Sequence, residues 1–191
     1  MALEHALLVA LTEKPGSGLE LTRRFEKSFG FFWHATHQQI YRVLGRMVSQ
    51  GLLDVEVVAQ DARPDKKVYR VTQAGRAWIA EWIGAPTPLE PLRSDLAVKM
   101  RAATLGDRDA LTRNLVEARA EHRVRLAHFE QLEAAYPDLS ALTDLERDQY
   151  LVLRGGVRME RYLIDWLTDY LRAWGADPEQ PTAQPGEEDL P

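Results

Sequence analysis

The sequence predicts a mostly α-helical fold with one small β-hairpin, divided into two domains. Three observations lead to this prediction. Apolar residues recur at three- and four-residue spacing through most of the 191 residues. Two short runs, 52–58 and 67–71, are instead rich in valine or alternate apolar and polar side chains, as strands do. Three prolines within residues 85–91 separate the region that contains these runs from a second region that is helical throughout.

Two helices are predicted near the start of the chain. Apolar residues at helical spacing predict the first helix over 3–13, and a Lys-Pro-Gly sequence ends it. Ser17 and Glu20 then form a capping box, in which each side chain accepts a hydrogen bond from the other residue's backbone amide. This box predicts the start of a second helix that ends near Gly30.

The third predicted helix has the clearest pattern. Thr36 and Gln39 form a second capping box at its start, and Gly51 ends it. Its apolar residues fall within about one third of the helix circumference, as expected for a core-facing stripe. They are Ile40, Val43, Leu44, Met47 and Val48.

The predicted β-hairpin follows this helix directly. Its strands are 52–58 and 67–71, and the intervening segment 61–65 is rich in turn residues, with the cations Arg63, Lys66 and Lys67 near the tip. Thr72 is placed to cap a fourth helix, which carries three large apolar side chains, Trp78, Ile79 and Trp82.

Three helices, a hairpin with a basic tip and a closing helix form the outline of a winged helix-turn-helix domain, predicted over 1–84. A protein helix fits the major groove of DNA, where Gln pairs with adenine and Arg with guanine or phosphate. We therefore predict that the polar face of the third helix and the hairpin, or wing, bind DNA. The expected base contacts are Gln38, Gln39 and Arg42, and the expected phosphate contacts are Tyr41, Arg46, Arg63, Lys66 and Lys67. His37 and Tyr69 complete the predicted DNA-binding set.

Two other interpretations of the same residues remain open. Polar helix faces are very common, so the pattern also fits an amphipathic helix whose outer face is only solvated. A winged-helix adaptor could use the same helix to bind another protein instead of specific DNA.

The charge distribution permits DNA binding without requiring it. The formal net charge is −5, which by itself argues against a nucleic-acid partner. Residues 1–84 contain 11 Lys and Arg against 9 Asp and Glu, whereas residues 85–191 contain 13 against 20. The predicted winged domain is thus +2 and the remainder −7. Binding depends on where the cations lie and not on the total.

The second half is predicted to be a helical domain over 93–174, after a proline-rich linker at 85–92. Helices are expected over 94–104, 107–136 and 143–174; Pro137 follows the second, and Thr143 with Glu146 forms a capping box for the third. Residues 175–191 contain four prolines and a run of acids, which predicts a disordered tail.

The last predicted helix carries an apolar face that needs a partner. Leu163, Leu167, Tyr170 and Trp174 follow one another at steps of four, three and four, and Trp166 widens this face. The partner can be the 107–136 helix, a second copy of the protein, or both. DNA-binding proteins of this size usually occupy paired half-sites as two-fold dimers. We therefore expect a homodimer with Leu163, Trp166, Leu167, Tyr170 and Trp174 in its interface.

The sequence offers little for catalysis or metal binding. It contains no cysteine, which excludes disulfides, thiolate metal sites and cysteine nucleophiles. The five histidines lack carboxylates at metal-ligand spacing, and no phosphate-binding glycine loop or hydrolase motif occurs. We expect no metal, no cofactor and no enzymatic activity. No apolar run approaches the roughly 18 residues that a membrane span needs, and a cytoplasmic location is the expectation.

Motifs in both halves resemble the PadR family of transcriptional regulators. Six motifs carry the resemblance. In chain order, the first four are similar to the family's second helix, its recognition helix, the exit into the wing, and the wing. The last two are similar to its final helix. The six motifs are Gly18-Leu19-Glu20-Leu21, Gln39-Ile40-Tyr41, Gly51-Leu52-Leu53, Arg63-Pro64 with Lys67-Val68-Tyr69-Arg70-Val71-Thr72, Arg154-Gly155-Gly156 and Asp165-Trp166-Leu167.

The resemblance implies a winged helix-turn-helix domain joined to a C-terminal dimerisation domain of the virulence-activator type. It also implies a repressor that binds a palindromic operator as a homodimer and responds to a small aromatic or phenolic effector. No residue pattern identifies that effector.

Overall fold

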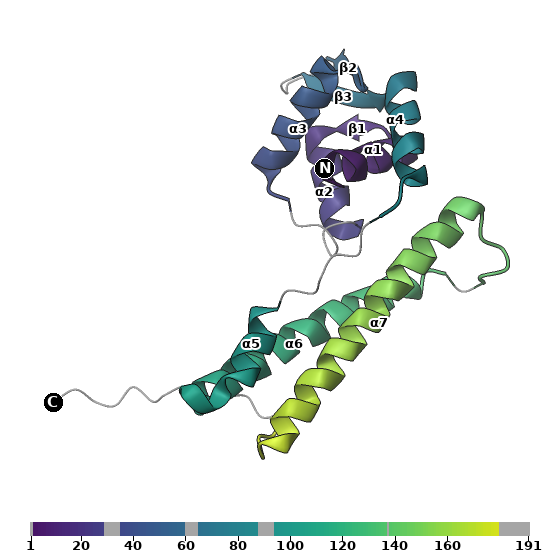
Figure 1. Cartoon of the computed structure of the whole chain (residues 1–191). Coiled ribbons are helices and arrows are strands. Elements are labelled where there is room, and N and C mark those ends of the chain that lie inside the picture. Colours follow the sequence, from purple (N-terminus) through teal and green to yellow (C-terminus); the bar gives the residue numbers. More distant parts are fainter. Residues whose placement is uncertain (1, 29–34, 60–64, 88–93, 137, 180–191) are drawn as a thin grey trace. The chain divides into compact units, whose positions relative to one another are not determined.

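The computed structural model describes residues 2–28, 35–59, 65–87, 94–136 and 138–179 (Figure 1). The chain divides into two compact units, Met1–Glu90 (unit 1) and Pro91–Pro191 (unit 2), and the division falls within the proline-rich segment. In the described parts of the chain, no helix is both long enough and apolar enough to cross a membrane.

In its described residues, unit 1 consists of four helices and a small sheet. Its elements in order are α1 (Ala2–Glu13), β1 (Gly16–Ser17), α2 (Gly18–Ser28), α3 (His37–Ser49), β2 (Leu53–Val58), β3 (Lys66–Val71) and α4 (Gln73–Gly84). The sheet is antiparallel with strand order β1-β3-β2. Gly16 pairs with Tyr69, and β2 pairs with β3 from Leu53 opposite Val71 to Val58 opposite Lys66.

The core of unit 1 forms around α1, which contacts α2, α3, α4 and β3. Burial of the apolar stripes of these helices supplies the main favourable term in folding. The completely or almost completely buried side chains are Leu7, Leu8, Leu11, Leu21, Phe25, Ile40, Leu44, Met47 and Leu53.

The joint between α3 and the sheet depends on one left-handed residue. Gly51 has φ of +71°, a conformation that side chains disfavour, and it turns the chain from α3 into β2. The Thr72 hydroxyl donates to the Gly51 carbonyl at 2.7 Å and accepts from the Gly75 amide at 3.0 Å. One threonine therefore closes the turn and caps α4, which fixes the hairpin relative to α3.

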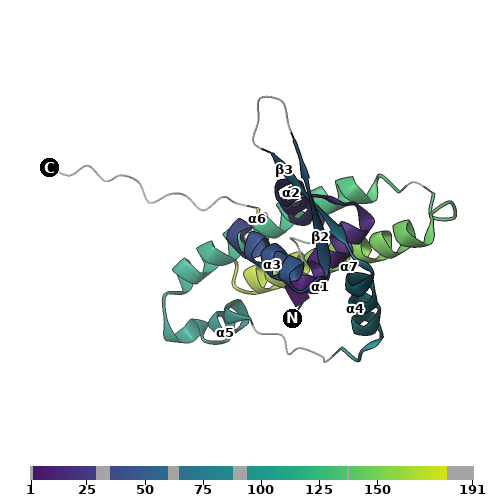
Figure 2. The same ribbon diagram turned by 90° about the horizontal axis from the view of Figure 1, so that it is seen from above.

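Unit 2 is entirely helical in its described residues. It contains α5 (Asp95–Arg101), the 3₁₀ turn η1 (Ala103–Leu105), α6 (Arg108–Glu133) and α7 (Asp144–Ala173). α6 and α7 lie side by side and antiparallel (Figures 1 and 2). Its core cluster lies where α5 and η1 meet these helices and consists of Met100, Ala103, Leu111, Leu115, Leu167 and Leu171.

The predicted fold class is confirmed, with differences in detail. The structure adds strand β1, which the sequence analysis did not predict, and it divides the predicted 94–104 helix into α5 and η1. The middle helix ends at Glu133, three residues earlier than predicted. Gly30, the tip residues 61–64 and Pro137 lie outside the described residues. All three predicted capping boxes form.

Candidate nucleic-acid interface

The start of α3 is fixed by its capping box. The Gln39 amide donates to the Thr36 hydroxyl at 3.2 Å, and the Thr36 amide donates to the Gln39 side-chain oxygen at 2.9 Å. Ile40, Val43 and Leu44 are buried on the opposite face. The Gln39 oxygen is therefore occupied by the cap, and its amide NH₂ is the group left for an outside partner.

Three of the predicted DNA-binding residues on α3 are exposed together. His37, Gln38 and Arg42 are all exposed, and Gln38 and Arg42 lie four residues apart, on one side of the helix. Arg42 forms no ion pair with any residue in the described segments. These side chains are exposed to solvent, and the helix that carries them contacts β2 of the hairpin (Figure 2).

Arg46, one turn further along α3, is exposed but paired within unit 1. Its guanidinium forms an ion pair with Glu4 of α1, whose carboxylate is nearly buried. A buried carboxylate requires a partner, because an isolated buried charge is strongly unfavourable. Arg46 therefore joins α3 to α1, and a DNA phosphate would share or replace this carboxylate.

Tyr41 is positioned by close packing against the start of α2. It is 46% exposed, and a Cβ built on Gly18 would collide with its ring. Tyr69 of β3 lies behind it and is nearly buried, and burial, with a smaller contribution from Tyr41, raises the pKa of the Tyr69 hydroxyl. Tyr41 is therefore open to solvent, whereas Tyr69, also predicted to bind DNA, is nearly buried.

The base of the wing is joined to α2 by Glu20. The Lys66 ammonium lies 2.7 Å from the Glu20 carboxylate, which also accepts from the Ser17 amide at 2.9 Å and the Ser17 hydroxyl at 3.0 Å. Its hydrogen bond with Lys66, followed by that from the Ser17 amide, lowers the pKa of Glu20 to about 2. Lys66 thus has an internal anionic partner at neutral pH.

Lys67 differs from its neighbour. It is exposed on β3 opposite Val57, and in the described part of the chain it has no ion-pair partner. Arg63 lies outside the described residues.

Sequence reasoning missed the residues that hold this surface in place. Glu4 and Glu20 pair with cations 42 and 46 residues away, so no local spacing indicates them. Arg70 was also absent from the predicted set, although it is exposed and only 3.5 Å from Glu56 on the neighbouring strand. Arg70 follows Lys66 and Val68 at two-residue steps and therefore shares one face of β3 with them. This spacing could have indicated Arg70 from the sequence.

The predicted dimer residues on α7 lie mainly against their own chain. Leu167 is completely buried in the core cluster and has no surface left for a partner. Trp166 and Tyr170 pack against the same cluster, and the Tyr170 hydroxyl donates to the Met100 carbonyl at 3.1 Å. Leu163 is half-buried, and Trp174 is 53% exposed beneath the Arg108 guanidinium, 3.6 Å from its ring centre.

The same side of α7, nearer the start of the helix, also exposes apolar side chains at regular spacing. Leu145, Val152 and Met159 are seven residues apart, and Tyr162 follows at the next step of three, with its ring stacked on Trp166. We call Leu145, Val152, Met159 and Tyr162 the outer stripe. Seven-residue spacing of apolar positions is typical of helices that pack against a second helix.

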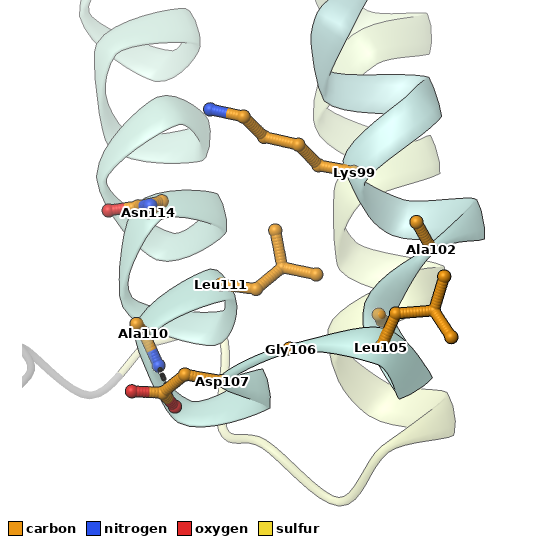
Figure 3. A pocket seen from close by; sticks show the side chains of 9 residues that line it. Lys99, Ala102, Leu105, Gly106, Asp107, Ala110, Leu111 and Asn114 are labelled. Atoms are coloured by element: carbon orange, nitrogen blue, oxygen red, sulfur yellow. Dashed lines mark hydrogen bonds between the residues drawn. The ribbon is translucent and has the colours of Figure 1, made fainter.

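Unit 2 also contains a pocket of about 320 Å³ between α5, η1 and the first turns of α6 (Figure 3). Leu111 and three alanines give it apolar walls, and Lys99 extends from α5 toward α6, where Asn114 lies. Asp107 at its edge accepts a hydrogen bond from the Ala110 amide at 3.0 Å and thereby caps α6. The pocket combines one cation with a largely apolar lining.

Comparison with known proteins identifies the family. The transcriptional regulator PadR-like family matches residues 7–81, and the virulence activator alpha C-terminal family matches residues 92–174. The probable transcriptional regulator Rv1176c of Mycobacterium tuberculosis is 45% identical over 184 residues, covering 91% of this chain and 97% of the relative. The chain belongs to the PadR-like family of transcriptional regulators. The resemblance predicted from the sequence motifs is thereby confirmed.

Solved structures of PadR-like proteins share the fold. The virulence activator AphA of Vibrio cholerae is 32% identical with a TM-score of 0.74, covering 91% of this chain and 98% of AphA. PadR of Bacillus subtilis, solved in complex with operator DNA, is 22% identical with a TM-score of 0.77, covering 91% and 99%. The PadR-like family consists of transcriptional regulators, which confirms that this chain is not an enzyme.

Proposed function

We propose that this PadR-like regulator is a cytoplasmic repressor that binds a palindromic operator as a homodimer. The observation that carries the proposal is the capped α3, which buries its apolar stripe in unit 1 and exposes Gln38 and Arg42 beside the wing. A similar protein, PadR of Bacillus subtilis, has been solved with operator DNA. The same protein is named a negative transcriptional regulator, which supports repression by occupying the operator.

The proposed DNA contacts fall into two groups. Gln38, Gln39 and Arg42 would contact base edges in the major groove, where paired donors and acceptors distinguish the bases. The other contacts would be to phosphates, which fix the position of the protein without specifying sequence. They are His37, Tyr41, Arg46, Arg63, Lys66 and Lys67, with Tyr69 supporting Tyr41 from beneath.

The proposed homodimer forms through unit 2. Leu163, Trp166 and Trp174 keep partial exposure, and the outer stripe adds an apolar surface on the same helix. A two-fold dimer would place two α3 helices on half-sites about one helical turn apart. The outer stripe is the part of this surface that the chain itself leaves uncovered.

The proposed effector is a small aromatic acid or phenol. PadR of Bacillus subtilis has been solved with p-coumaric acid. The pocket beside Lys99 has an apolar lining and one ammonium group, which suits a ring that carries a carboxylate. Such a ligand would release DNA only through a difference in affinity between the DNA-bound and free states.

Selection of binding sites from random DNA tests the proposal most directly. The expected result is an inverted repeat with half-site centres about one helical turn apart, bound with an affinity that falls steeply as salt rises. Arg42→Ala should relax the base preference within each half-site while leaving the spacing unchanged. Recovery of no common sequence, with affinity that barely changes between low and moderate salt, would instead favour a protein-binding adaptor.

A further inference from the structure

The chain beyond α7 turns back against α6. Gly175, with φ of +71°, ends α7 in a Schellman motif: its amide donates to the Arg172 carbonyl, and the Ala176 amide donates to the Leu171 carbonyl, both at 3.0 Å. Ala176 then packs against the core cluster of unit 2. This turn directs residues 177–179 to the side of α6 that carries Arg119.

Arg119 is a nearly buried cation that contacts both α7 and the segment after α7. Its side chain is 9% exposed, and its Nε donates to the Thr168 hydroxyl of α7 at 2.7 Å. Its two remaining nitrogens donate to the Pro178 carbonyl at 3.0 Å and to one Glu179 carboxylate oxygen at 2.7 Å. Arg123, one turn along α6, donates to the other Glu179 oxygen at 2.5 Å.

The side chains of Arg119 and Glu179 differ in how firmly they are held. Arg119 is nearly buried and is held by its hydrogen bond to Thr168 of α7, a contact that does not involve Glu179. Glu179 is 61% exposed, and besides the two arginines its contact in the described residues is the Asp177 carboxylate, which accepts from its amide at 2.9 Å. Hydrogen bonds from Arg119 and then Arg123 lower the pKa of Glu179, so the bound group is the carboxylate.

Arg119 is nearly buried with Glu179 in place, and removal of this anion would leave the charge of Arg119 uncompensated, which is unfavourable. Two guanidinium groups converging on the two oxygens of one carboxylate also form a geometry that selects carboxylates by shape.

We propose that Arg119 and Arg123 form a carboxylate-binding site between α6 and α7, which Glu179 fills from within the chain and which accepts a free carboxylate when Glu179 leaves. The site is separate from the Lys99 pocket, and the proposal does not depend on DNA binding. The chain thus carries its own competitor for any carboxylate ligand of this site.

Acetate is a suitable probe of the site. In full-length Glu179→Ala, thermal unfolding should occur below that of the wild type, and acetate should raise the unfolding temperature more than chloride at equal ionic strength. A tethered carboxylate has an effective concentration on the order of millimolar or more. The wild type should therefore need roughly tenfold more acetate for the same response. Glu121→Ala, which removes an exposed carboxylate from the same helix, should behave like the wild type.

The role of the arginines is tested by mutating Arg123, the more exposed of the two, because substitution of Arg119 can unfold the protein. Adding Arg123→Gln to Glu179→Ala should weaken the acetate response at least several-fold, whereas adding Lys99→Ala should not change it. In ¹⁵N spectra, acetate should shift the Arg119 Nε–H signal of Glu179→Ala. The proposal is overturned if Glu179→Ala responds to acetate no more than Glu121→Ala, or if that response persists unchanged without Arg123.

Discussion

At the scale of single residues, two adjacent lysines at the base of the wing differ in what balances their charge. Lys66 is 2.7 Å from the Glu20 carboxylate, whereas Lys67 is exposed and has no ion-pair partner among the described residues. A cation that already has an anionic partner releases fewer counterions when a phosphate approaches. The two lysines should therefore contribute unequally to DNA binding.

Lys67→Ala should lower DNA affinity and reduce the slope of log affinity against log salt by about one unit. Lys66→Ala should reduce the slope by clearly less, because Lys66 is already paired with Glu20. Fluorescence anisotropy with a fixed operator between low and moderate salt measures both slopes. Equal changes for the two variants would contradict the role assigned to Glu20.

The Glu20–Lys66 pair also predicts a pH dependence of stability. The pKa of Glu20 is lowered to about 2 from an ordinary value of 4.5, so the folded state binds this proton less readily than the unfolded state. The resulting stabilisation is complete above pH 4.5 and is lost as the pH falls from 4.5 to 2. The difference in unfolding free energy between wild type and Glu20→Gln should therefore shrink over this interval. Urea denaturation at several pH values measures it.

Gly18→Ala should move the Tyr41 ring, because the new methyl group would collide with it. We expect a loss of about 1 kcal/mol in unfolding free energy, at the low end for overpacking, since the half-exposed ring can rotate away. DNA affinity should fall as well. Gly45→Ala in α3 is the control: its new methyl group meets nothing within 4 Å. It should leave stability unchanged or raise it by roughly 0.5–1 kcal/mol. A Gly18→Ala protein with wild-type stability and DNA affinity would show that the contact does not position Tyr41.

At the scale of secondary-structure elements, α7 buries one side within unit 2 and exposes apolar residues on another. Val157, Leu167 and Leu171 are buried against unit 2, while the outer stripe lies on the exposed side. The predicted seam from Leu163 to Trp174 included both buried and exposed residues. The sequence of a 30-residue helix rich in apolar residues does not indicate which face packs against its own chain.

Met159→Lys should weaken the proposed dimer, because it would place a charge in the middle of the outer stripe, where a partner helix would have to bury it. Sedimentation velocity at micromolar concentration should show an increased monomer fraction with unchanged helical content. Val98→Lys, an equally apolar-to-cationic change on exposed α5, is the control and should remain dimeric. A dimer that tolerates Met159→Lys must form through another surface.

Local signals predicted most of the elements, whereas long-range contacts could not be predicted. The starts of α2, α3 and α7 follow from capping boxes, which are complete within four residues. β1 has only two residues and exists because β3 offers it an edge, so no alternation could indicate it. On α3 the exposed Gln38 and Arg42 were predictable from helical periodicity, but the Glu4 partner of Arg46 was not, because it lies on another helix.

At the scale of the whole molecule, the chain separates its charges between its first 84 residues and the remainder. The region predicted to bind DNA is slightly cationic, at +2 over residues 1–84, and the remainder is −7. Residues 175–179, predicted as part of a disordered tail, are held against α6 through Ala176, Pro178 and Glu179. One acidic residue of the second half, Glu179, is thus bound by arginines of the same unit.

The internal pairing of Arg46 and Lys66 has a consequence for the search of a genome. Both cations are already neutralised by carboxylates of unit 1, so random DNA gains little by attracting them. Weak binding to arbitrary sequence shortens the time that the protein spends at each non-specific site. More of the protein is then free to bind the operator. Glu4 and Glu20 would then act against the many wrong sites more than against the right one, where base contacts can offset the loss of these pairs.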